Sequence, residues 1–170
     1  VTIGARSYVP LYGTEDKKPV SIQPFFLDVY PVTNKEYLVF TKLNPNYRKS
    51  KIKRLFANTT YLYEWSGDLS FGTLNASAPV TNVSWFAAKQ YCECQGKRLP
   101  TLDEWEYVAM ADEKRKDART RKEFNKYILS WYEKNKTYNN SVGKTFKNYW
   151  GVYDMHGLVW EWTFDFNSIF

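Results

Sequence analysis

The 170-residue sequence has only two cysteines and one histidine, which restricts the chemistry that it can perform. A closed zinc site uses a tetrahedral set of cysteine and histidine ligands, and Cys92, Cys94 and His156 are too few to complete one. His156 also has no arrangement of base and nucleophile near it of the Ser-His-Asp or Cys-His type, and we expect it to close a turn before Gly157. Cys92 and Cys94 are two positions apart in a predicted helix, so their side chains should lie on opposite faces, the first buried and the second at the surface.

Long apolar runs and glycine-rich phosphate loops are also absent. No segment approaches the roughly 20 apolar residues of a transmembrane helix, so the sequence predicts no membrane span. Nothing matches the P-loop or the dinucleotide-binding fingerprint. Aromatic residues, by contrast, are abundant: 7 Trp, 14 Tyr and 11 Phe. Because such rings fill irregular spaces between short elements, we expect residues 1–170 to form a single domain with little long regular structure.

The net charge of +6 is unevenly distributed. Residues 42–54 contain six basic side chains and no acidic one, and residues 111–136 contain nine basic and five acidic side chains. Basic clusters can attract nucleic acid, anionic lipid or an acidic protein, or can simply form a solvated surface. No nucleic-acid motif accompanies the charge, so the sequence favours the solvated surface over nucleic-acid binding.

Local patterns predict two short strands followed by four helices. We expect short strands at residues 1–10 and 21–30, where apolar residues cluster between Gly and Pro. A first helix should begin after Thr33, whose capping box is completed by Glu36, and end near residue 43. Residues 44–78 lack periodicity and should be mostly loop.

The remaining helices are predicted from caps and from one aromatic stripe. Ser84 should cap a helix that ends at Gly96, with a buried stripe of Trp85, Ala88 and Tyr91 or Cys92. Thr101 and Glu104 form a second capping box, and Leu102, Trp105, Val108 and Ala109 should form the apolar face of the helix that follows. Residues 118–133 should form a fourth helix whose stripe is core, and loops with short strands should follow Tyr138. That stripe consists of Phe124, Tyr127, Ile128, Trp131 and Tyr132.

Asp154 and Glu161 are two carboxylates separated by six residues, including Gly157. If this segment folds back on itself, the carboxylates and the intervening backbone carbonyls can surround a hard cation such as calcium. Alternatively, the two carboxylates form hydrogen bonds with the backbone or with basic side chains. The spacing alone leaves both interpretations open.

Four blocks, residues 26–37, 79–85, 96–107 and 151–162, together resemble the formylglycine-generating enzymes, also called sulfatase-modifying factors. They read FLDVYPVTNKEY, PVTNVSW, GKRLPTLDEWEY and GVYDMHGLVWEW, in the family's order. The resemblance implies an α+β, C-type-lectin-like fold with much irregular structure. It also implies a calcium site made by the carboxylates of Asp154 and Glu161 and by backbone oxygens of Gly157 and Val159. The family's other calcium site lies in the loop before this block, which is short here, so Asn139 or Asn140 would be a remnant ligand.

The departures from the family concern its chemistry. Its enzymes use oxygen to convert a cysteine of a substrate protein to formylglycine, with a copper ion held by two cysteines near the C-terminus. Neither Cys92 nor Cys94 matches that pair, and Cys92 instead matches a structural cysteine of some relatives, whose disulfide partner would lie beyond Phe170. Leu158 also stands where the family usually has asparagine. We therefore expect the domain to lack its C-terminal catalytic part and to be incompetent as these 170 residues alone.

Two functions remain open after the sequence analysis. The first is a formylglycine-generating-type oxidase that acts on a cysteine-containing protein substrate and has further chain carrying the copper ligands. The second is a non-catalytic, lectin-like binding or accessory module that retains the calcium site. The sequence does not identify the substrate or the compartment.

Overall fold

A computed structural model describes residues 1–10, 18–134 and 137–165, and within them the fold is a mixture of short helices, one small sheet and long irregular segments. This confirms the predicted α+β class. The strands are β1 (Ile3–Tyr8) and β2 (Val20–Phe25). The α-helices are α1 (Asn34–Leu43), α2 (Trp85–Cys94), α3 (Leu102–Ala109) and α4 (Lys122–Tyr132), and the 3₁₀ turns are η1 (Pro45–Tyr47) and η2 (Thr137–Asn139).

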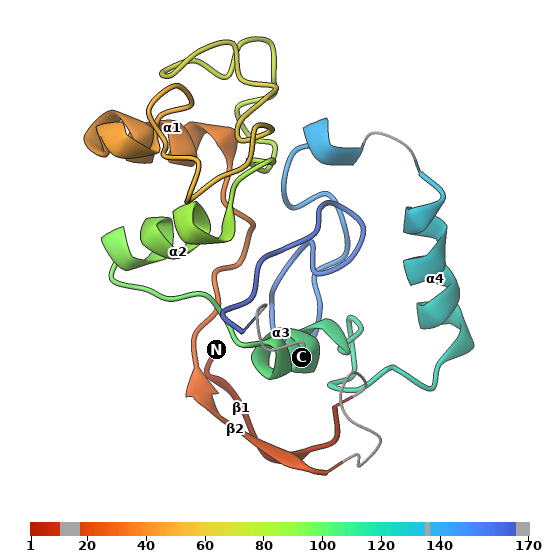
Figure 1. The fold of residues 1–170 in the computed structure, drawn as a ribbon. Coiled ribbons are helices and arrows are strands. Elements are labelled where there is room, and N and C mark those ends of the chain that lie inside the picture. The colour runs from red at the N-terminus through yellow and green to blue at the C-terminus, as the bar shows by residue number, and fades with distance from the viewer. Residues whose placement is uncertain (11–17, 135–136, 166–170) are drawn as a thin grey trace.

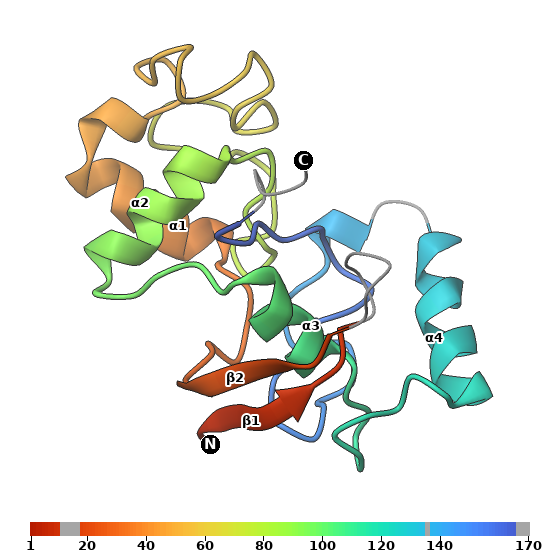
Figure 2. The ribbon, with the colours of Figure 1, turned by 60° about the horizontal axis from the view of Figure 1, so that its bottom comes forward.

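The elements surround a central irregular segment (Figures 1 and 2). Helices α1 and α2, with the turns between them, form one side of the molecule, and the β1–β2 hairpin lies against α3 at another. The chain after residue 140, drawn in blue, runs through the middle, and α4 lies at the outer edge. None of the described helices combines the length and the apolar character needed to cross a bilayer.

Two clusters of buried side chains form the core. One lies between the sheet, α3 and the central segment, and the other lies between α1, α2 and the turns of residues 57–65. The first contains Ile3, Tyr8, Ile22, Tyr107, Val108, Ala109, Met110, Ala111, Trp150, Val152 and Met155. The second contains Tyr37, Phe40, Ala57, Tyr61, Leu62, Trp65 and Ala87.

The two strands pair antiparallel, with Ile3 opposite Phe25 and Tyr8 opposite Val20. The prediction that the second strand continues to residue 30 was wrong, because β2 ends at Phe25. Residues 26–30 contact the central segment instead of extending the strand. The Val29 carbonyl accepts a hydrogen bond from the backbone N–H of Tyr153 (2.9 Å), and the ring of Tyr30 stacks on that of Tyr153.

The predicted helix starts are confirmed. Thr33 and Thr101 each form a full capping box with the glutamate three residues later, and the Ser84 hydroxyl accepts from the Ala87 N–H. These caps satisfy N–H groups that have no partner inside the helix. Residues 44–78 are mostly turns, as predicted.

The predicted buried faces of α2 and α3 need correction. In α2 the fully buried residue is Ala87, whereas Trp85, Ala88, Tyr91 and Cys92 are only partly buried. Ala87 belongs to the α1-side cluster, while Trp85 turns toward residues near the end of the described chain. In α3, Val108 and Ala109 are buried as predicted, but Leu102 and Trp105 are only partly so. The helices pack on more than one neighbour, so a single stripe does not describe their burial.

Helix α4 is present, but it begins at Lys122 rather than near residue 118, and its aromatic stripe is only partly core. Phe124 is buried, Tyr127, Ile128 and Trp131 are half-buried, and Tyr132 is 66% exposed. The helix lies at the edge of the molecule (Figure 1), and its stripe is exposed at Tyr132, whereas Trp131 packs against Gly157. The short strands expected after Tyr138 are not found within residues 137–165, where turns and bends hold the chain.

Candidate functional site

Asp154 is a buried carboxylate that holds two parts of the central segment together. It is 2% exposed and has a positive φ of 61°. One carboxylate oxygen accepts from the Gly143 N–H (2.6 Å) and the other from the Thr145 hydroxyl (2.8 Å). The Asp154 N–H in turn donates to Thr145 Oγ1 (2.8 Å). Asp154 thus fixes the loop at 143–145 against the start of the turn that leads to Glu161.

Glu161 lies at the other end of this turn and faces a cavity. Its Oε2 accepts a hydrogen bond from the indole N–H of Trp105 (2.7 Å). Solvent reaches the residue through the cavity, yet protein atoms surround its carboxylate, and this burial raises the pKa of Glu161 to about 7. The indole hydrogen bond acts in the opposite direction, and the negative charge of Asp154 adds to the rise.

The backbone between the two carboxylates presents further oxygens. The Leu158 carbonyl accepts from the Thr137 hydroxyl (3.0 Å). Within the part of the chain that the structure describes, the carbonyls of Gly157 and Val159 accept no hydrogen bond. Those two carbonyls and the Glu161 carboxylate all carry oxygen atoms, which is the type of ligand that calcium prefers. The predicted remnant ligand Asn139 uses its Oδ1 to accept from the Asn75 N–H (2.9 Å).

His156 has a structural contact that its sequence neighbourhood did not indicate. Its Nε2 lies 2.6 Å from the Ala109 carbonyl at the end of α3, and its ring meets Trp105 and Phe124 edge-on. Burial lowers the pKa of His156, because the charged imidazolium is poorly solvated there. The histidine thus joins α3, α4 and the turn.

Residues 161–165 are tied to the starts of α2 and α3 by four further hydrogen bonds. Two come from indoles: Trp85 donates to the Thr163 carbonyl, and Trp162 donates to the Val83 carbonyl. The other two involve the backbone of α3's first turn, where the Leu102 N–H donates to Asp165 and the Pro100 carbonyl accepts from Phe164. Sequence reasoning missed all of these contacts, since partners so far apart in the chain leave no local signal.

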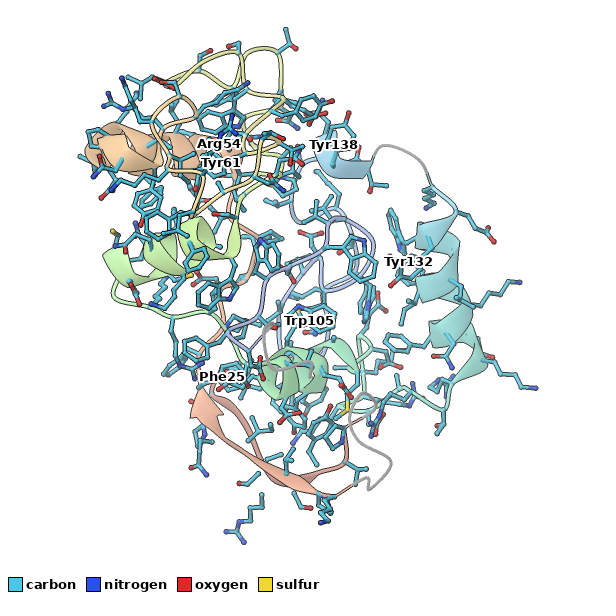
Figure 3. The ribbon with its side chains drawn as sticks, viewed as in Figure 1. Phe25, Arg54, Tyr61, Trp105, Tyr132 and Tyr138 are labelled. Atoms are coloured by element: carbon cyan, nitrogen blue, oxygen red, sulfur yellow. The ribbon has the colours of Figure 1, made fainter. Side chains whose placement is uncertain are left out.

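These contacts border a cavity of about 530 Å³ between the two sides of the molecule. Its walls are mainly apolar and aromatic, and its charged groups include Glu161 together with Asp28, Lys97 and Arg98. Three of these four charged groups are paired: Lys97 with Asp28 (2.8 Å), and Arg98 with Glu104, which lies outside the cavity lining (2.7 Å). The aromatic lining residues are Phe25, Phe26, Tyr30, Tyr37, Tyr91, Trp105, Tyr153, Trp160 and Trp162. Figure 3 shows Trp105 at α3, between Phe25 and the central segment.

The two cysteines do not form a metal site. Both are free thiols; Cys92 is half-buried and lines the cavity, whereas Cys94 is exposed and faces Gln90 and Asn44. A copper ion held by two thiolates needs both sulfurs on one side, so the pair does not fit such an ion. Among the described residues there is also no group of three or more His, Cys, Asp and Glu side chains suited to a metal.

In the described part of the second basic segment, residues 111–134, several basic side chains have partners within the segment or on nearby rings. Arg115 forms an ion pair with Asp112 (3.1 Å), and Arg119 pairs with Asp117 (2.8 Å). Lys116 and Lys134 lie over aromatic rings. These pairings leave less free positive charge than the sequence count suggests, and they favour a solvated surface here.

Comparison with known proteins relates this geometry to one family. A model of the sulfatase-modifying factor enzyme 1-like domain matches residues 3–169. A Chlamydia pneumoniae protein named serine/threonine-protein kinase pkn1 is 31% identical over 157 residues, which are 90% of this chain and 25% of that protein. The Bos taurus inactive C-alpha-formylglycine-generating enzyme 2 is 27% identical over 189 residues, 89% of this chain and 63% of that protein.

The Bos taurus formylglycine-generating enzyme is 25% identical over 197 residues, which cover 92% of this chain and 53% of the enzyme. The chain therefore spans about a quarter of the kinase-named relative and between half and two-thirds of the two bovine proteins.

Proposed function

The chain belongs to the sulfatase-modifying factor enzyme 1-like family, and we propose that its 170 residues act as a non-catalytic binding module for a segment of a cysteine-containing protein. The observation that carries this proposal is the position of the thiols. Cys92 lines the cavity and Cys94 lies outside it, so the cavity has walls that can bind a ligand but no pair of cysteines that could hold copper.

The cavity has the properties of a ligand site. Its volume of about 530 Å³ lies within the range of roughly 300–1,000 Å³ found for such sites. Apolar and aromatic walls supply most of the binding energy, and a few polar groups give orientation. Here the polar groups are the open oxygen of Glu161 and the Lys97–Asp28 pair, which lie on different elements of the wall.

The relatives support a role separable from catalysis. One of them carries the name of an inactive formylglycine-generating enzyme and matches 89% of this chain. Another is named a protein kinase, and the match covers only a quarter of it, so this kind of domain also occurs inside much longer proteins. A domain used in both settings is suited to recognising a partner.

The competing function is the conversion of a substrate cysteine to formylglycine by oxygen. Its support is the similarity to the formylglycine-generating enzyme itself. These 170 residues offer no thiol pair for its copper, so that activity would require ligands from further chain.

A binding assay combined with mass spectrometry separates the two functions. The chain is titrated with a fluorescent, cysteine-containing sulfatase peptide, and the same peptide is then incubated with chain, oxygen and copper. We expect binding without formylglycine, and weaker binding by Ala88→Trp, which places an indole in the cavity. Val39→Trp, on the exposed side of α1, is the matched control and should bind normally. Formylglycine formation, or the absence of binding, would contradict the proposal.

We also propose that a calcium ion stabilises the 154–161 turn. The carbonyls of Gly157 and Val159 and the Glu161 carboxylate would bind it, and water would complete the six to eight oxygens that calcium takes. Asp154, which the resemblance implies as a further ligand, already accepts hydrogen bonds from Gly143 and Thr145 with its two oxygens. It would position the turn, and its negative charge would favour the cation. Bound calcium would stabilise the turn and would take no part in a reaction.

A further inference from the structure

The basic residues of the 42–54 segment fall into two groups with different roles. Lys49 belongs to the first group: its ammonium donates to the Tyr63 carbonyl (2.9 Å) and to the Trp65 carbonyl (2.5 Å). This lysine therefore binds a neighbouring turn of the same fold. Because both hydrogen bonds hold the ammonium group against the protein, its charge is not available to a partner.

Arg48 is the other internal cation and links the two ends of the segment. Its guanidinium donates to the carbonyls of Thr41 (3.1 Å) and Lys42 (3.2 Å) at the end of α1. Its own carbonyl accepts from the N–H groups of Lys51 and Ile52 (both 3.0 Å). Arg48 thus holds the end of α1, at residues 41–42, close to the turn at residues 51–52.

The remaining four cations, Lys42, Lys51, Lys53 and Arg54, are exposed. Within the described residues none of their side chains forms an ion pair or a hydrogen bond. The acidic residue Asp68 accepts hydrogen bonds from the N–H and the hydroxyl of Ser50 (2.7 Å each), and these bonds, together with the charges of Lys51 and Arg48, lower its pKa. Its single negative charge offsets only part of the four positive charges. The structure therefore leaves a local excess of positive charge facing solvent.

Two leucines stand directly beside these cations and are almost fully exposed. Leu43 follows Lys42 and is 76% exposed, and Leu55 follows Arg54 and is 80% exposed. The next residue, Phe56, packs edge-on against Phe86 (5.4 Å between ring centres), which anchors the end of the segment. Figure 3 shows Arg54 and Tyr61 near α1, well apart from Phe25 at the end of β2.

We propose that this basic–leucine surface, formed by Lys42, Leu43, Lys51, Lys53, Arg54 and Leu55, binds an anionic lipid bilayer. Lipid phosphate and carboxylate groups would pair with the four cations, while the two leucine side chains enter the boundary between headgroups and acyl chains. A bilayer offers both chemistries side by side. Nucleic acid would neutralise the charge, but it has no apolar layer for two leucines, and these six residues include no aromatic ring for base stacking. This inference does not depend on the proposed binding function of the cavity.

Vesicle sedimentation tests this surface directly. The full chain is mixed with vesicles of phosphatidylcholine alone, or with about one-third phosphatidylserine. We expect it to pellet only with the anionic vesicles, and less as salt increases. The triple variant Lys51→Glu/Lys53→Glu/Arg54→Glu should partition at least roughly 100-fold more weakly, since each basic residue near such a surface contributes about fivefold.

The matched control is the triple variant Lys114→Glu/Lys122→Glu/Lys126→Glu. It reverses three exposed lysines of the other basic segment and therefore has the same net charge as the first triple variant. It should keep most of the vesicle binding. Equal loss in both variants would show attraction by net charge alone and would overturn the proposal.

Leu55→Ser separates insertion from charge attraction. With all cations present, this variant should still respond to salt but bind several-fold more weakly, because it loses the apolar contact. Unchanged binding would contradict the insertion of Leu55. The wild-type chain could instead bind neither kind of vesicle but bind a short DNA duplex through the same three cations. That result would overturn the lipid proposal and identify the surface as a nucleic-acid interface.

Discussion

Trp85 and Trp162 donate hydrogen bonds across one interface in opposite directions. The indole N–H of Trp85 donates to the Thr163 carbonyl, and that of Trp162 donates to the Val83 carbonyl, each over 2.9 Å. Each tryptophan thus contacts the chain next to the other. The pair holds residues 161–165 against the start of α2 and keeps Glu161 at the wall of the cavity.

Trp85→Phe and Trp162→Phe retain an aromatic ring but remove the indole N–H. Each leaves one carbonyl without its donor, so the free energy of unfolding should fall by about 1 kcal/mol. Urea denaturation measures this change. Trp160→Phe is the control, since Trp160 is 87% exposed and makes no such bond within the described residues. Variants at 85 and 162 as stable as this control would refute the role of the pair.

Gly157 is expected to tolerate no side chain. A β-carbon there would come within 2.3 Å of Trp131 Cδ2, and the residue has a φ of +93°. Gly157→Ala should therefore lower the free energy of unfolding by about 3 kcal/mol or more, through both overlap and backbone strain. Gly151→Ala is the matched control: it has a φ of +82° but open space around it, so it should cost only about 1 kcal/mol. Thermal unfolding compares the two, and equal losses would show that the Trp131 contact is unimportant.

The free energy of unfolding should depend on pH through the carboxylate of Glu104. Burial acts to raise the pKa of Glu104, but hydrogen bonds from the Arg98 guanidinium and the Thr101 N–H more than offset it, so the pKa lies below its ordinary 4.5. The folded state thus releases this proton more readily than the unfolded state. Its contribution is present above pH 4.5 and is lost as the pH falls through the folded pKa.

Glu104→Gln should remove this acid-dependent part of the stability and, at neutral pH, cost about 1–2 kcal/mol through the lost ion pair and weakened cap. The measurement is the free energy of unfolding at several pH values. Glu93→Gln, in the exposed Lys89–Glu93 pair, is the control and should change little. An unchanged pH profile for Glu104→Gln would contradict the assignment.

Calcium should raise the melting temperature of the wild-type chain, and a chelator should reverse the rise, because an ion bound only to the folded state stabilises it. Glu161→Gln should abolish this response, since the amide carries no charge to hold the ion. Magnesium should act weakly, and Glu133→Gln, at the exposed end of α4, should respond like wild type. A Glu161→Gln chain that still responds to calcium would exclude the proposed turn.

Helix starts were predictable from sequence because a cap and its partner are neighbours in the chain. Thr33 with Glu36 and Thr101 with Glu104 satisfy each other within three residues, whatever the rest of the fold does. The separation of Cys92 and Cys94 was predictable for the same reason, since it follows from helical geometry alone.

The sequence by itself thus determined the helices, their caps, the mixed α/β class and the blocks that mark the family. Only the tertiary structure decided that β2 stops at Phe25, that Ala87 rather than Trp85 is buried, and that Arg48 and Lys49 turn inward. It also decided that Glu161 meets Trp105, 56 residues away in the chain. Local patterns record the interactions of a residue with its neighbours, whereas these contacts depend on which distant segments the folded core brings together.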